Sequence, residues 1–453
     1  MNLKLSIFYL LLFIPLTFFG QKIQRRAYLG VKLESISDTL SKDLLSEKQN
    51  GVLVKRVYSN TSAFKAGIKS GDIISKINGD LISSKHVFIQ KYGHLYDGDS
   101  LVIDFVRSGK TKQVGVKLRG KPLEKREIGR NIYGNVNTAL GNIRTILTIP
   151  EQGNNFPLIF YIQGYTNSSI DNLYKHSPYN KIIDDFVNSG FAVLRIEKLG
   201  VGDSKAYKSK DEIDFHEEVS TFQSVYNSLS KLDYINNKEV YILGVSMGGV
   251  IAPMIKQKIP AKGIIVFGTV ARPWFEYFVE QSRVQRVLIG ESYLDNEKKF
   301  PKRLGFYYDY LVKKLTPREL AQIPGYKNIL AADWSNDGKS NLMDRRNYKY
   351  WQQLQDNKPY SAWASVTSHV LSIWGASDFV SFSKDDHVLI RDIVNKYHPE
   401  KATFLQLQNI DHAFMKVKNQ RESLNYWGDW NYYKENYNSD FVRAIVSWIR
   451  GLK

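Results

Sequence analysis

Seven apolar runs that alternate with helical segments are the feature that most restricts how the second part of this chain can fold. Continuous apolar strands separated by amphipathic helices are typical of a mainly parallel sheet with helices on both faces. From residue 131 onward we therefore expect an α/β domain whose ligand lies at the carboxyl ends of the strands. The expected strands are IRTILTI (143–149), PLIFYI (157–162), FAVLRI (191–196), VYILGV (240–245), GIIVFG (263–268), VLSIWG (370–375) and ATFLQL (402–407). The expected helices lie near 173–189, 217–231, 248–258, 384–397 and 438–451.

The sequence Gly244-Val245-Ser246-Met247-Gly248 follows one of these strands directly and precedes an apolar helical segment. A G-x-S-x-G motif between a strand and a helix forms a tight turn that exposes the serine hydroxyl above the sheet, with glycines where side chains would collide. The alternative is a glycine-rich turn without chemistry. The position of the motif between a strand and a helix favours Ser246 as a nucleophile.

A serine nucleophile needs a base, and the base needs an acid that orients it. In a serine hydrolase of this class the chain order is serine, acid, histidine. His412 follows the strand ATFLQL, and Asp378 follows the strand VLSIWG, so both stand where the ligand of such a sheet should lie. We predict His412 as the base and Asp378 as the acid. The alternatives are a packed loop histidine and a surface turn aspartate, and Asp385 and Asp386 are expected to cap the next helix instead.

With this order of residues, positions 131–453 resemble the α/β-hydrolase family, closest to exported bacterial carboxylesterases and the serine aminopeptidase-like branch. The resemblance implies acyl transfer. Ser246 would attack a carbonyl, His412 would take and return the proton, and Asp378 would hold the imidazole. Water would then hydrolyse the acyl-enzyme.

The oxyanion that develops in such a reaction needs two preorganised donors. The backbone N–H of Met247, directly after the nucleophile, is one expected donor, and the backbone of Tyr165, in the loop after PLIFYI, is the other. Relatives often have histidine where this chain has Gln163. The segment from Arg195 to Ser204 resembles the family's R-x-D-x-x-G-x-G-x-S loop, with Glu197 in place of the aspartate, and this loop is structural in relatives.

About 100 residues, 270–369, separate the strands GIIVFG and VLSIWG, which is too long for a plain connection, so we expect a helical cap insertion over the site. The cap holds 17 aromatic residues, which form either its own core or the wall of an apolar acyl pocket. Its 16 basic and 11 acidic residues favour ester over peptide substrates, because an aminopeptidase needs carboxylates to hold the substrate's ammonium group.

Residues 28–118 show short strands with period two, bounded by Gly, Asn and Asp, which indicates a small β-rich module. Tyr28-Leu29-Gly30-Val31, SAFKAGIKSGDIISKINGDLI at 62–82 and DGDSLVIDFVRSG at 97–109 resemble a PDZ domain of the kind found in exported proteases. The resemblance implies that the Tyr28–Val31 loop binds a peptide C-terminus and that the following strand accepts an added strand, with a helix near 84–95 as the other wall of the groove. The alternative is a closed groove, which either packs against the neighbouring module or serves only as a spacer.

Residues 119–130 form a basic connector between the two modules. We expect a solvated hinge, with a surface-binding patch as the alternative, because charge runs usually face water. A surface-binding patch would allow peripheral association with the cell envelope.

Residues 1–20 fit a secretory signal peptide, with Lys4 before a short apolar core and a cleavage site after Gly20. Phe18 departs from the small-residue rule for cleavage sites, so an uncleaved anchor is the alternative. We therefore expect an exported protein, periplasmic or extracellular.

The composition excludes several classes of function. With no cysteine, the chain has no disulfide scaffold, cysteine nucleophile or thiolate metal site. The formal charge of +18 is spread through all segments without a nucleic-acid motif, so we expect no nucleic-acid partner. His216-Glu217 lacks the second histidine of a zinc-protease helix, and Gly200-Val-Gly202 lacks a third glycine for dinucleotide binding, so we expect no metal and no cofactor.

These features predict an exported carboxylic ester hydrolase that uses a Ser-His-Asp triad, with a PDZ module that binds or positions a peptide tail. One alternative is a serine peptidase that uses the same triad. The other is a peptide-binding scaffold whose hydrolase domain has no catalytic activity.

Overall fold

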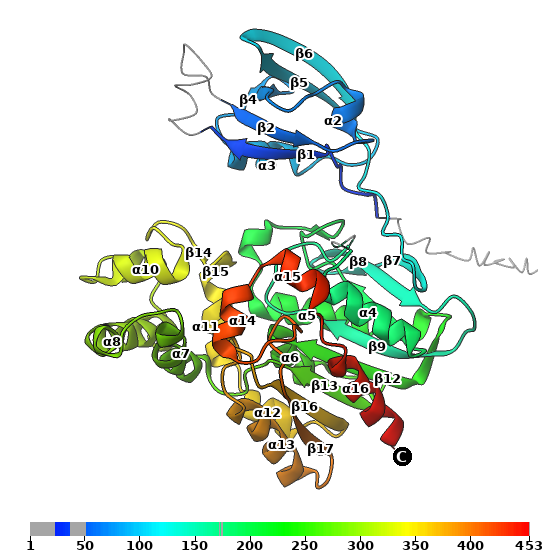
Figure 1. The fold of residues 1–453 in the computed structure, drawn as a ribbon, viewed down its shortest axis with the longest axis vertical. Coiled ribbons are helices and arrows are strands. Elements are labelled where there is room, and N and C mark those ends of the chain that lie inside the picture. The colour runs from blue at the N-terminus through cyan, green and yellow to red at the C-terminus, as the bar shows by residue number, and fades with distance from the viewer. Residues whose placement is uncertain (1–22, 37–50, 172, 174, 453) are drawn as a thin grey trace, which may run out of the picture.

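The computed structural model describes residues 23–36, 51–171, 173 and 175–452, and the expected signal segment 1–20 lies outside this part of the chain. The chain forms two bodies, a small β-rich N-terminal module and a larger α/β body (Figure 1). The segment that enters the small module and the segment that leaves it run side by side, joined by a bridge between Ala27 and Gly120.

The N-terminal module is an antiparallel sheet in the order β1-β2-β3-β5-β6, with β4 paired to β3. Its core is aliphatic, with Val54, Ile74 and Ile103 fully buried. Among the described residues, β1 pairs with β2 alone, so its other edge carries no strand. The elements are β1 (Val31–Ser35), β2 (Val52–Val57), α2 (Ser62–Lys65), β3 (Ile73–Ile77), β4 (Asp80–Leu81), α3 (Lys85–Tyr92), β5 (Ser100–Arg107) and β6 (Lys110–Lys117).

The larger body is built on a nine-stranded sheet in the order β11-β8-β10-β9-β12-β13-β16-β17, with β7 paired to the other side of β8. From β10 to β17 all neighbours are parallel, and β7, β8 and β11 add an antiparallel edge. The expected α/β architecture is confirmed. The strands are β7 (Arg130–Thr138), β8 (Gly141–Ile149), β9 (Phe156–Ile162), β10 (Ala192–Ile196), β11 (Lys205–Ala206), β12 (Ile235–Val245), β13 (Gly263–Phe267), β16 (His369–Gly375) and β17 (Ala402–Leu407).

Helices cover both faces of this sheet, and each face has its own hydrophobic core. One core packs α4 and α16 on the sheet, and the other packs α5, α6 and α13 on the opposite face. The strands read as continuous apolar runs because both of their faces are buried. The helices are α4 (Pro178–Asn188), α5 (Phe215–Tyr226), α6 (Met247–Ile251), α13 (Asp385–Tyr397), α14 (Gln420–Tyr426), α15 (Trp430–Glu435) and α16 (Asp440–Gly451).

The helix expected over 248–258 is shorter in the structure. Helix α6 ends at Ile251, and a 3-10 turn, η3 (Ala252–Met254), follows it. Pro253 lies in this turn, and proline lacks the N–H that a continuing α-helix would need. The expectation was wrong because it ran the helical period through the proline.

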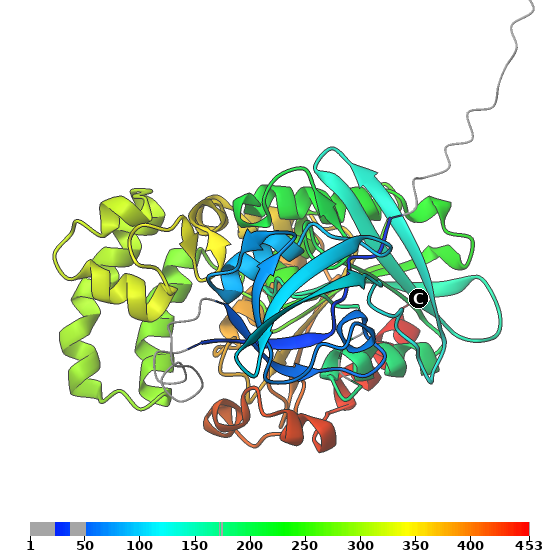
Figure 2. The same ribbon diagram turned by 90° about the horizontal axis from the view of Figure 1, so that it is seen from above.

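The insertion between β13 and β16 forms a helical cap beside the sheet (Figure 2). A short hairpin, β14 (Leu342–Met343) and β15 (Arg346–Asn347), lies within the cap and was not expected from the sequence. Many cap aromatics pack on one another in a shared core with the sheet. The cap helices are α7 (Trp274–Leu288), α8 (Tyr293–Tyr307), the π-helical turn η4 (Tyr308–Val312), α9 (Pro317–Leu320), α10 (Tyr326–Trp334), α11 (Tyr348–Asp356) and α12 (Pro359–Ala364).

The connector between the modules is not a solvated hinge along its whole length. Glu124 is buried, and its carboxylate forms ion pairs with Arg195 at 2.6 Å and Arg126 at 2.5 Å. Burial raises the pKa of Glu124, but the two arginines outweigh this effect and hold it at about 2. The central part of the connector is therefore fixed to the α/β body.

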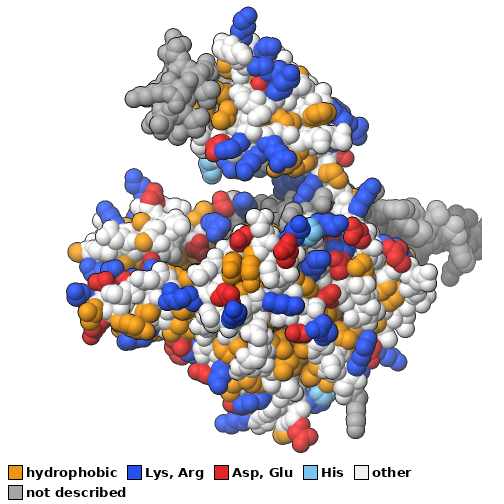
Figure 3. Space-filling view, viewed as in Figure 1, with side chains coloured by type: hydrophobic (Ala, Val, Ile, Leu, Met, Phe, Trp, Pro, Cys, Tyr) orange, Lys and Arg blue, Asp and Glu red, His pale blue; other side chains and the backbone are white. Residues whose placement is uncertain are grey.

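Basic side chains are distributed over the visible face of both bodies (Figure 3). Within the described ranges, no helix is both long enough and apolar enough to span a bilayer.

Candidate active site and peptide groove

Ser246 stands in the sharp turn between β12 and α6. Its backbone has φ +55° and ψ −121°, a conformation that side-chain-bearing residues rarely adopt. The turn is possible because the flanking positions are glycines. A Cβ on Gly244 would lie 2.5 Å from the Gly248 carbonyl oxygen, and a Cβ on Gly248 would lie 2.0 Å from the Ile162 carbonyl oxygen. The local geometry is therefore the one that the G-x-S-x-G sequence predicted.

Asp378 and His412 lie together beyond the ends of β16 and β17. His412 Nδ1 lies 2.7 Å from Asp378 Oδ2, and the other carboxylate oxygen accepts the N–H groups of Val380 and Ser381, each at 2.8 Å. Asp378 is fully buried. Because a carboxylate can only accept, Nδ1 carries the proton and Nε2 is left as the basic nitrogen.

The pKa of His412 is raised above its ordinary value. Burial lowers it, but the charge and hydrogen bond of Asp378 and the charge of Asp411 together outweigh burial. The same carboxylates would stabilise an imidazolium if one formed on this ring.

Gly268 lies between the serine turn and the histidine. The Ser246 N–H donates to the carbonyl of Phe267 at 2.8 Å, and a Cβ on the next residue, Gly268, would lie 2.9 Å from His412 Nδ1 and 3.0 Å from Asp378 Oδ2. Within the described part of the chain, no hydrogen bond joins the Ser246 hydroxyl to His412. The structure thus brings the three predicted residues to one place but joins only two of them directly.

The loop after β9 passes close to Ser246. A Cβ on Gly164 would lie 3.0 Å from the Ser246 Cβ. Among the described residues, the backbone N–H groups of Tyr165 and Met247 donate to no partner, so both are free to receive an oxygen atom. Gln163, the departure from the family pattern, is buried and donates to the Ile196 carbonyl at 2.9 Å.

A buried ionic cluster under this loop was missed by sequence reasoning. Lys198 Nζ donates to the Gly164 carbonyl at 2.6 Å and to Glu218 at 2.7 Å. Arg346, from β15 of the cap, donates to the Tyr165 carbonyl at 2.6 Å and to Glu218 at 2.7 Å. Burial lowers the pKa of Lys198 to about 8, although the Glu218 charge opposes this effect. The cluster holds both carbonyls of the Gly164–Tyr165 segment.

Glu197, which replaces the aspartate of the family loop, has a structural position. Its carboxylate accepts the Ser169 hydroxyl at 2.5 Å and the N–H groups of Ile170 and Asp171. A Cβ on Gly202 would lie 2.5 Å from the Glu197 carboxyl carbon. Glu197 thus ties the loop after β10 to the loop after β9.

The other candidate groups do not reach His412. Asp386 accepts the Ala271 N–H at 2.9 Å and pairs with Arg272, so it does not cap its own helix as expected. His387 is fully buried between Ser372 and the Thr269 N–H, and burial lowers its pKa to about 4. No group of three or more potential metal ligands is found among the described residues.

Two further residues near His412 had no sequence signal. Asp411 accepts the Met415 N–H at 2.8 Å and the Ser423 hydroxyl at 2.8 Å, and burial raises its pKa to about 6. Trp427, which is 46% exposed, lies with its ring centre 6.2 Å from that of His412. Both come from the segment after β17, whose packing on the site depends on tertiary contacts.

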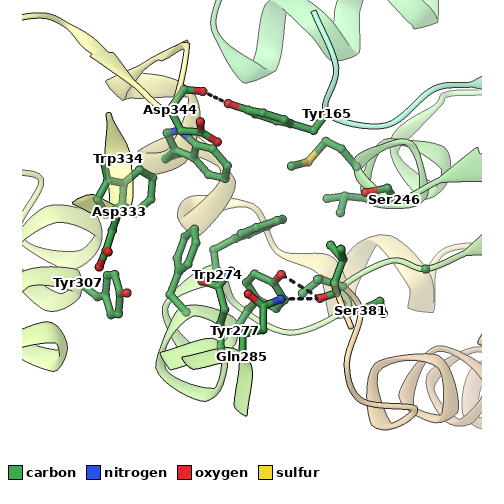
Figure 4. A pocket seen from close by; sticks show the side chains of 18 of the residues that line it. Tyr165, Ser246, Trp274, Tyr277, Gln285, Tyr307, Asp333, Trp334, Asp344 and Ser381 are labelled. Atoms are coloured by element: carbon green, nitrogen blue, oxygen red, sulfur yellow. Dashed lines mark hydrogen bonds between the residues drawn. The ribbon is translucent and has the colours of Figure 1, made fainter. Parts of the chain in front are cut away.

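A cavity of about 420 Å³ begins at Ser246 and extends into the cap (Figure 4). Tyr165 and Met247 line its inner end with the serine. The cap supplies aromatic walls to this cavity from Trp274, Tyr277, Phe278, Tyr307, Trp334 and Trp351. Part of the cap's aromatic set is therefore core, and part faces this cavity.

The Tyr28–Val31 loop of the small module has the backbone that its glycine predicts. Gly30 has φ +80°, and a Cβ there would lie 2.2 Å from the Thr61 side chain. Among the described residues, the Gly30 N–H donates to no partner, whereas the Leu29 N–H faces the Tyr92 hydroxyl. Free N–H groups at the start of an edge strand can receive a carboxylate.

Comparison with known proteins divides the chain in the same way. A model of the PDZ domain matches residues 27–118, and a model of the serine aminopeptidase family S33 matches residues 174–300. The periplasmic serine endoprotease DegP of Escherichia coli is 35% identical over 95 residues, which are 21% of this chain and 20% of DegP. A probable periplasmic serine protease do/HhoA-like protein of Haemophilus influenzae is 36% identical over 101 residues, 22% of this chain and 21% of that protein. The chain thus covers about a fifth of the length of these curated relatives.

Solved structures also resemble this chain at low sequence identity. Est1E from Butyrivibrio proteoclasticus matches with a TM-score of 0.39 and 15% identity over 62% of this chain and 90% of its own. The Pyrococcus furiosus esterase PF2001 matches with a TM-score of 0.42 and 11% identity over 72% and 91% of the two chains.

The two family models agree with the sheet topologies of the two bodies. The chain therefore combines an N-terminal module that matches the PDZ domain over residues 27–118 with an α/β body that matches the serine aminopeptidase S33 family over residues 174–300.

Proposed function

We propose that this chain is an exported serine hydrolase that cleaves carboxylic esters through an acyl-enzyme on Ser246. The observation that carries the proposal is the 2.7 Å hydrogen bond between His412 and Asp378. This pair lies against Gly268. The carbonyl of the preceding residue, Phe267, accepts the backbone N–H of Ser246. A strained serine, a neighbouring imidazole and a buried acid are the parts that acyl transfer by serine requires.

Each residue has a defined role in the proposed reaction. The Ser246 hydroxyl attacks the ester carbonyl while His412 Nε2 takes its proton, and the negative charge that develops on the carbonyl oxygen is received by the N–H groups of Met247 and Tyr165. The imidazolium then gives the proton to the departing alcohol. Water repeats the cycle on the acyl-enzyme, and Asp378 keeps the imidazole in one tautomer throughout.

The missing bond between Ser246 and His412 is compatible with this sequence of steps. Catalytic hydrogen bonds in free enzymes are often long and shorten only when the substrate is bound. Rotation of the serine side chain is the rearrangement that the proposal requires.

Ester substrates are favoured over peptides because of the charges at the cavity. Of the two cavity carboxylates, Asp333 is paired with Arg286, which leaves it a poor partner for a substrate ammonium group. The aromatic walls favour an apolar acyl group.

Asp344 supports a second candidate function, aminopeptidase activity. It lines the cavity, and its ion pair with Arg345 Nε is long, at 3.8 Å. A carboxylate held this loosely could receive the ammonium group of an N-terminal aminoacyl substrate.

Turnover of short-chain p-nitrophenyl esters and of aminoacyl anilides separates these functions. We expect ester hydrolysis by the wild-type protein and its loss in Ser246→Ala. Anilide hydrolysis alone, reduced in Asp344→Asn, would support the peptidase instead. No turnover of either substrate would indicate a peptide-binding scaffold and contradict the proposal.

For the PDZ domain we propose binding of a peptide C-terminus at the Tyr28–Val31 loop. The free N–H group of Gly30 supports this assignment, as does the open edge of β1 among the described residues. The groove would recruit or position a peptide tail for the hydrolase.

Changing the C-terminus of the peptide tests the groove better than substituting Gly30. Any side chain at Gly30 would collide with Thr61, so a substitution would disturb the loop itself. Fluorescence anisotropy should show binding of a peptide library with free C-terminal carboxylates and weaker binding of the same peptides as C-terminal amides. Equal affinity for both would contradict carboxylate recognition.

We further propose that the protein is exported, with the signal segment removed after Gly20. The order of charged, apolar and polar residues at the N-terminus supports export, as does the match of the PDZ domain to periplasmic proteases. The proposed partners are a small acyl ester and a peptide tail, with association at the envelope surface through the basic charge. N-terminal sequencing of the secreted protein tests the cleavage site.

A further inference from the structure

The cavity at Ser246 is bounded differently on its two sides. Ser246, Met247 and Tyr165 line its inner end, and Gly268 and Thr269 line the side toward His412. His412 and Asp378 themselves do not line the cavity. Gly268 stands in front of them, because a Cβ at this position would lie within 3.0 Å of both side chains.

This arrangement decides which half of an ester the cavity can hold. The departing alcohol must lie against His412, which protonates it, whereas the acyl carbonyl must lie against Ser246 and the oxyanion donors. The cavity adjoins the serine and the proposed oxyanion donors, and neither His412 nor Asp378 lines it. It therefore lies on the acyl side, and the alcohol side lies toward the exposed Trp427.

The walls of the cavity are rings that lie at contact distance from one another. The ring centres of Trp274 and Phe278 are 5.6 Å apart, those of Phe278 and Trp351 are 5.7 Å apart, and those of Phe278 and Trp334 are 5.1 Å apart. Most of these pairs are steeply inclined. Such walls present ring edges and faces to a guest, which favours a flat aromatic group over a flexible alkyl chain.

The outer end of the cavity is open between α7 and α10. Ile289, which is 54% exposed, and the exposed Ala332 line this end, and Arg286 and Asp333 form an ion pair there. A long acyl arm can extend from Ser246 through the aromatic segment to this opening.

We propose that the cap cavity is the acyl-binding subsite and that the substrate is an ester whose acyl arm carries an aromatic ring. The proposal rests on ester hydrolysis at Ser246, the proposed function. The aromatic segment binds the ring, and the alcohol departs on the His412 side.

Two substrates and two variants of the full chain test this subsite. The substrates are p-nitrophenyl phenylbutanoate and p-nitrophenyl octanoate, which have acyl arms of similar length. The test variant is Ala332→Trp, which fills the outer part of the cavity. The control is Ala331→Trp, at the neighbouring exposed position of α10, which does not line the cavity.

We expect the wild-type protein to hydrolyse the phenylbutanoate with a kcat/KM about threefold to tenfold above that for the octanoate. Ala332→Trp should remove this preference, and Ala331→Trp should keep it. The ratio of the two substrates on one protein is independent of how much of that protein is folded. A wild-type preference for the octanoate, or equal effects of the two variants, would overturn the proposal.

A binding measurement separates failure of the subsite from failure of the proposed function. Free phenylbutanoate should quench the fluorescence of the cavity tryptophans in Ser246→Ala, and the added Ala332→Trp substitution should abolish saturation. If no ester is hydrolysed but this binding is seen, the proposed function is wrong and the subsite stands. If esters are hydrolysed through Ser246 but Ala332→Trp leaves binding and selectivity unchanged, the subsite is wrong and the function stands.

Discussion

The absence of a side chain at Gly268 leaves room for the His412 imidazole. The residue has φ +58°, and a Cβ would lie 2.9 Å from His412 Nδ1. In Gly268→Ala the imidazole must move, and a misplacement of about 1 Å can cost about a hundredfold in rate. We expect kcat/KM for p-nitrophenyl esters to fall by about that factor. Steady-state kinetics on the purified variant measure this loss.

Gly190→Ala controls for backbone strain in this experiment. Gly190 has φ +91°, but a Cβ there would meet nothing within 4 Å. Both substitutions carry the cost of a left-handed alanine, about 1 kcal/mol. If Gly190→Ala lost as much activity as Gly268→Ala, contact with His412 would not be the cause.

Asp411 should tune the pH profile of the enzyme. The base works only when His412 is neutral, so kcat/KM should rise with pH and level off above the raised pKa of His412. Asp411→Asn removes one of the charges that raise this pKa, so the midpoint of the rise should move to lower pH. The pKa of Asp411 itself is about 6, so its charge acts mainly above that pH. A pH series of kcat/KM for both proteins measures the shift.

Ser423→Ala provides the comparison for Asp411→Asn. It removes the 2.8 Å hydrogen bond to Asp411 but leaves the carboxylate. A shift of the midpoint in Ser423→Ala as large as that in Asp411→Asn would mean that loop packing, and not charge, controls the base.

At the residue scale, the sequence predicted the groups whose chemistry requires a fixed motif or chain order. Ser246 was predicted from its glycines, and Asp378 and His412 were predicted from their positions after strands. Lys198, Glu218 and Arg346 could not be found in this way, because they meet only when the cap lies on the sheet. Buried ion pairs between distant segments leave no periodic signal.

Among the elements, the β14–β15 hairpin links the cap to the oxyanion loop. Arg346 from β15 donates to the Tyr165 carbonyl, and the Tyr165 hydroxyl donates to the Asp344 carbonyl at the tip of the hairpin. The position of the proposed oxyanion donor therefore depends on the docked cap. Arg346 and the hairpin contact Tyr165 and not the substrate, so their role is to position the proposed donor.

Arg346→Lys tests this positioning role. Lysine keeps the charge but cannot bind Glu218 and the Tyr165 carbonyl with one planar group. We expect kcat to fall about tenfold, within the range for a disturbed oxyanion donor, with KM changed much less. Arg345→Lys, the neighbouring and largely exposed position, is the control and should change neither constant. A rise of KM with kcat preserved would contradict the positioning role.

Elements were predictable where a periodic pattern and burial coincide. The six strands of the parallel part and the antiparallel strand β8 read as apolar runs because both of their faces are covered. The hairpin was missed because its strands have two residues each and its turn places Asp344 and Arg345 at positive φ, where a sequence normally signals a turn with glycine or asparagine. Tertiary contacts at Arg346 and Tyr165 replace that local signal.

For the whole molecule, the sequence indicated two modules but not how firmly they are joined. The basic connector suggested a hinge, yet Glu124 and Arg126 are buried against the α/β body. The charge count alone could not show this, because a buried carboxylate with two arginines and a solvated charge run have the same composition.

Arg25 forms two ion pairs between the segment that enters the PDZ domain and the hydrolase, beside the hydrogen bonds of Arg26 to Asp203 and Gly202. Its guanidinium pairs with Asp171 at 2.5 Å and Asp203 at 2.6 Å, and it also donates to the Lys121 carbonyl at 2.7 Å. Arg25 stands three residues before Tyr28, at the start of the proposed peptide loop. The Arg25 ion pairs and the proposed peptide-binding loop therefore lie on one short segment.

Arg25→Ala should loosen the PDZ domain from the hydrolase without unfolding either. Removal of charged hydrogen bonds that are mostly shielded from water costs about 2 kcal/mol. We expect a larger radius of gyration in small-angle X-ray scattering and faster proteolysis within 119–129. Lys175→Ala is the control, since its ion pair with Glu127 is exposed at both ends and contributes little. If the two variants scattered alike, the Arg25 pairs would not hold the domains together, and the fixed connector at Glu124 would have to do so alone.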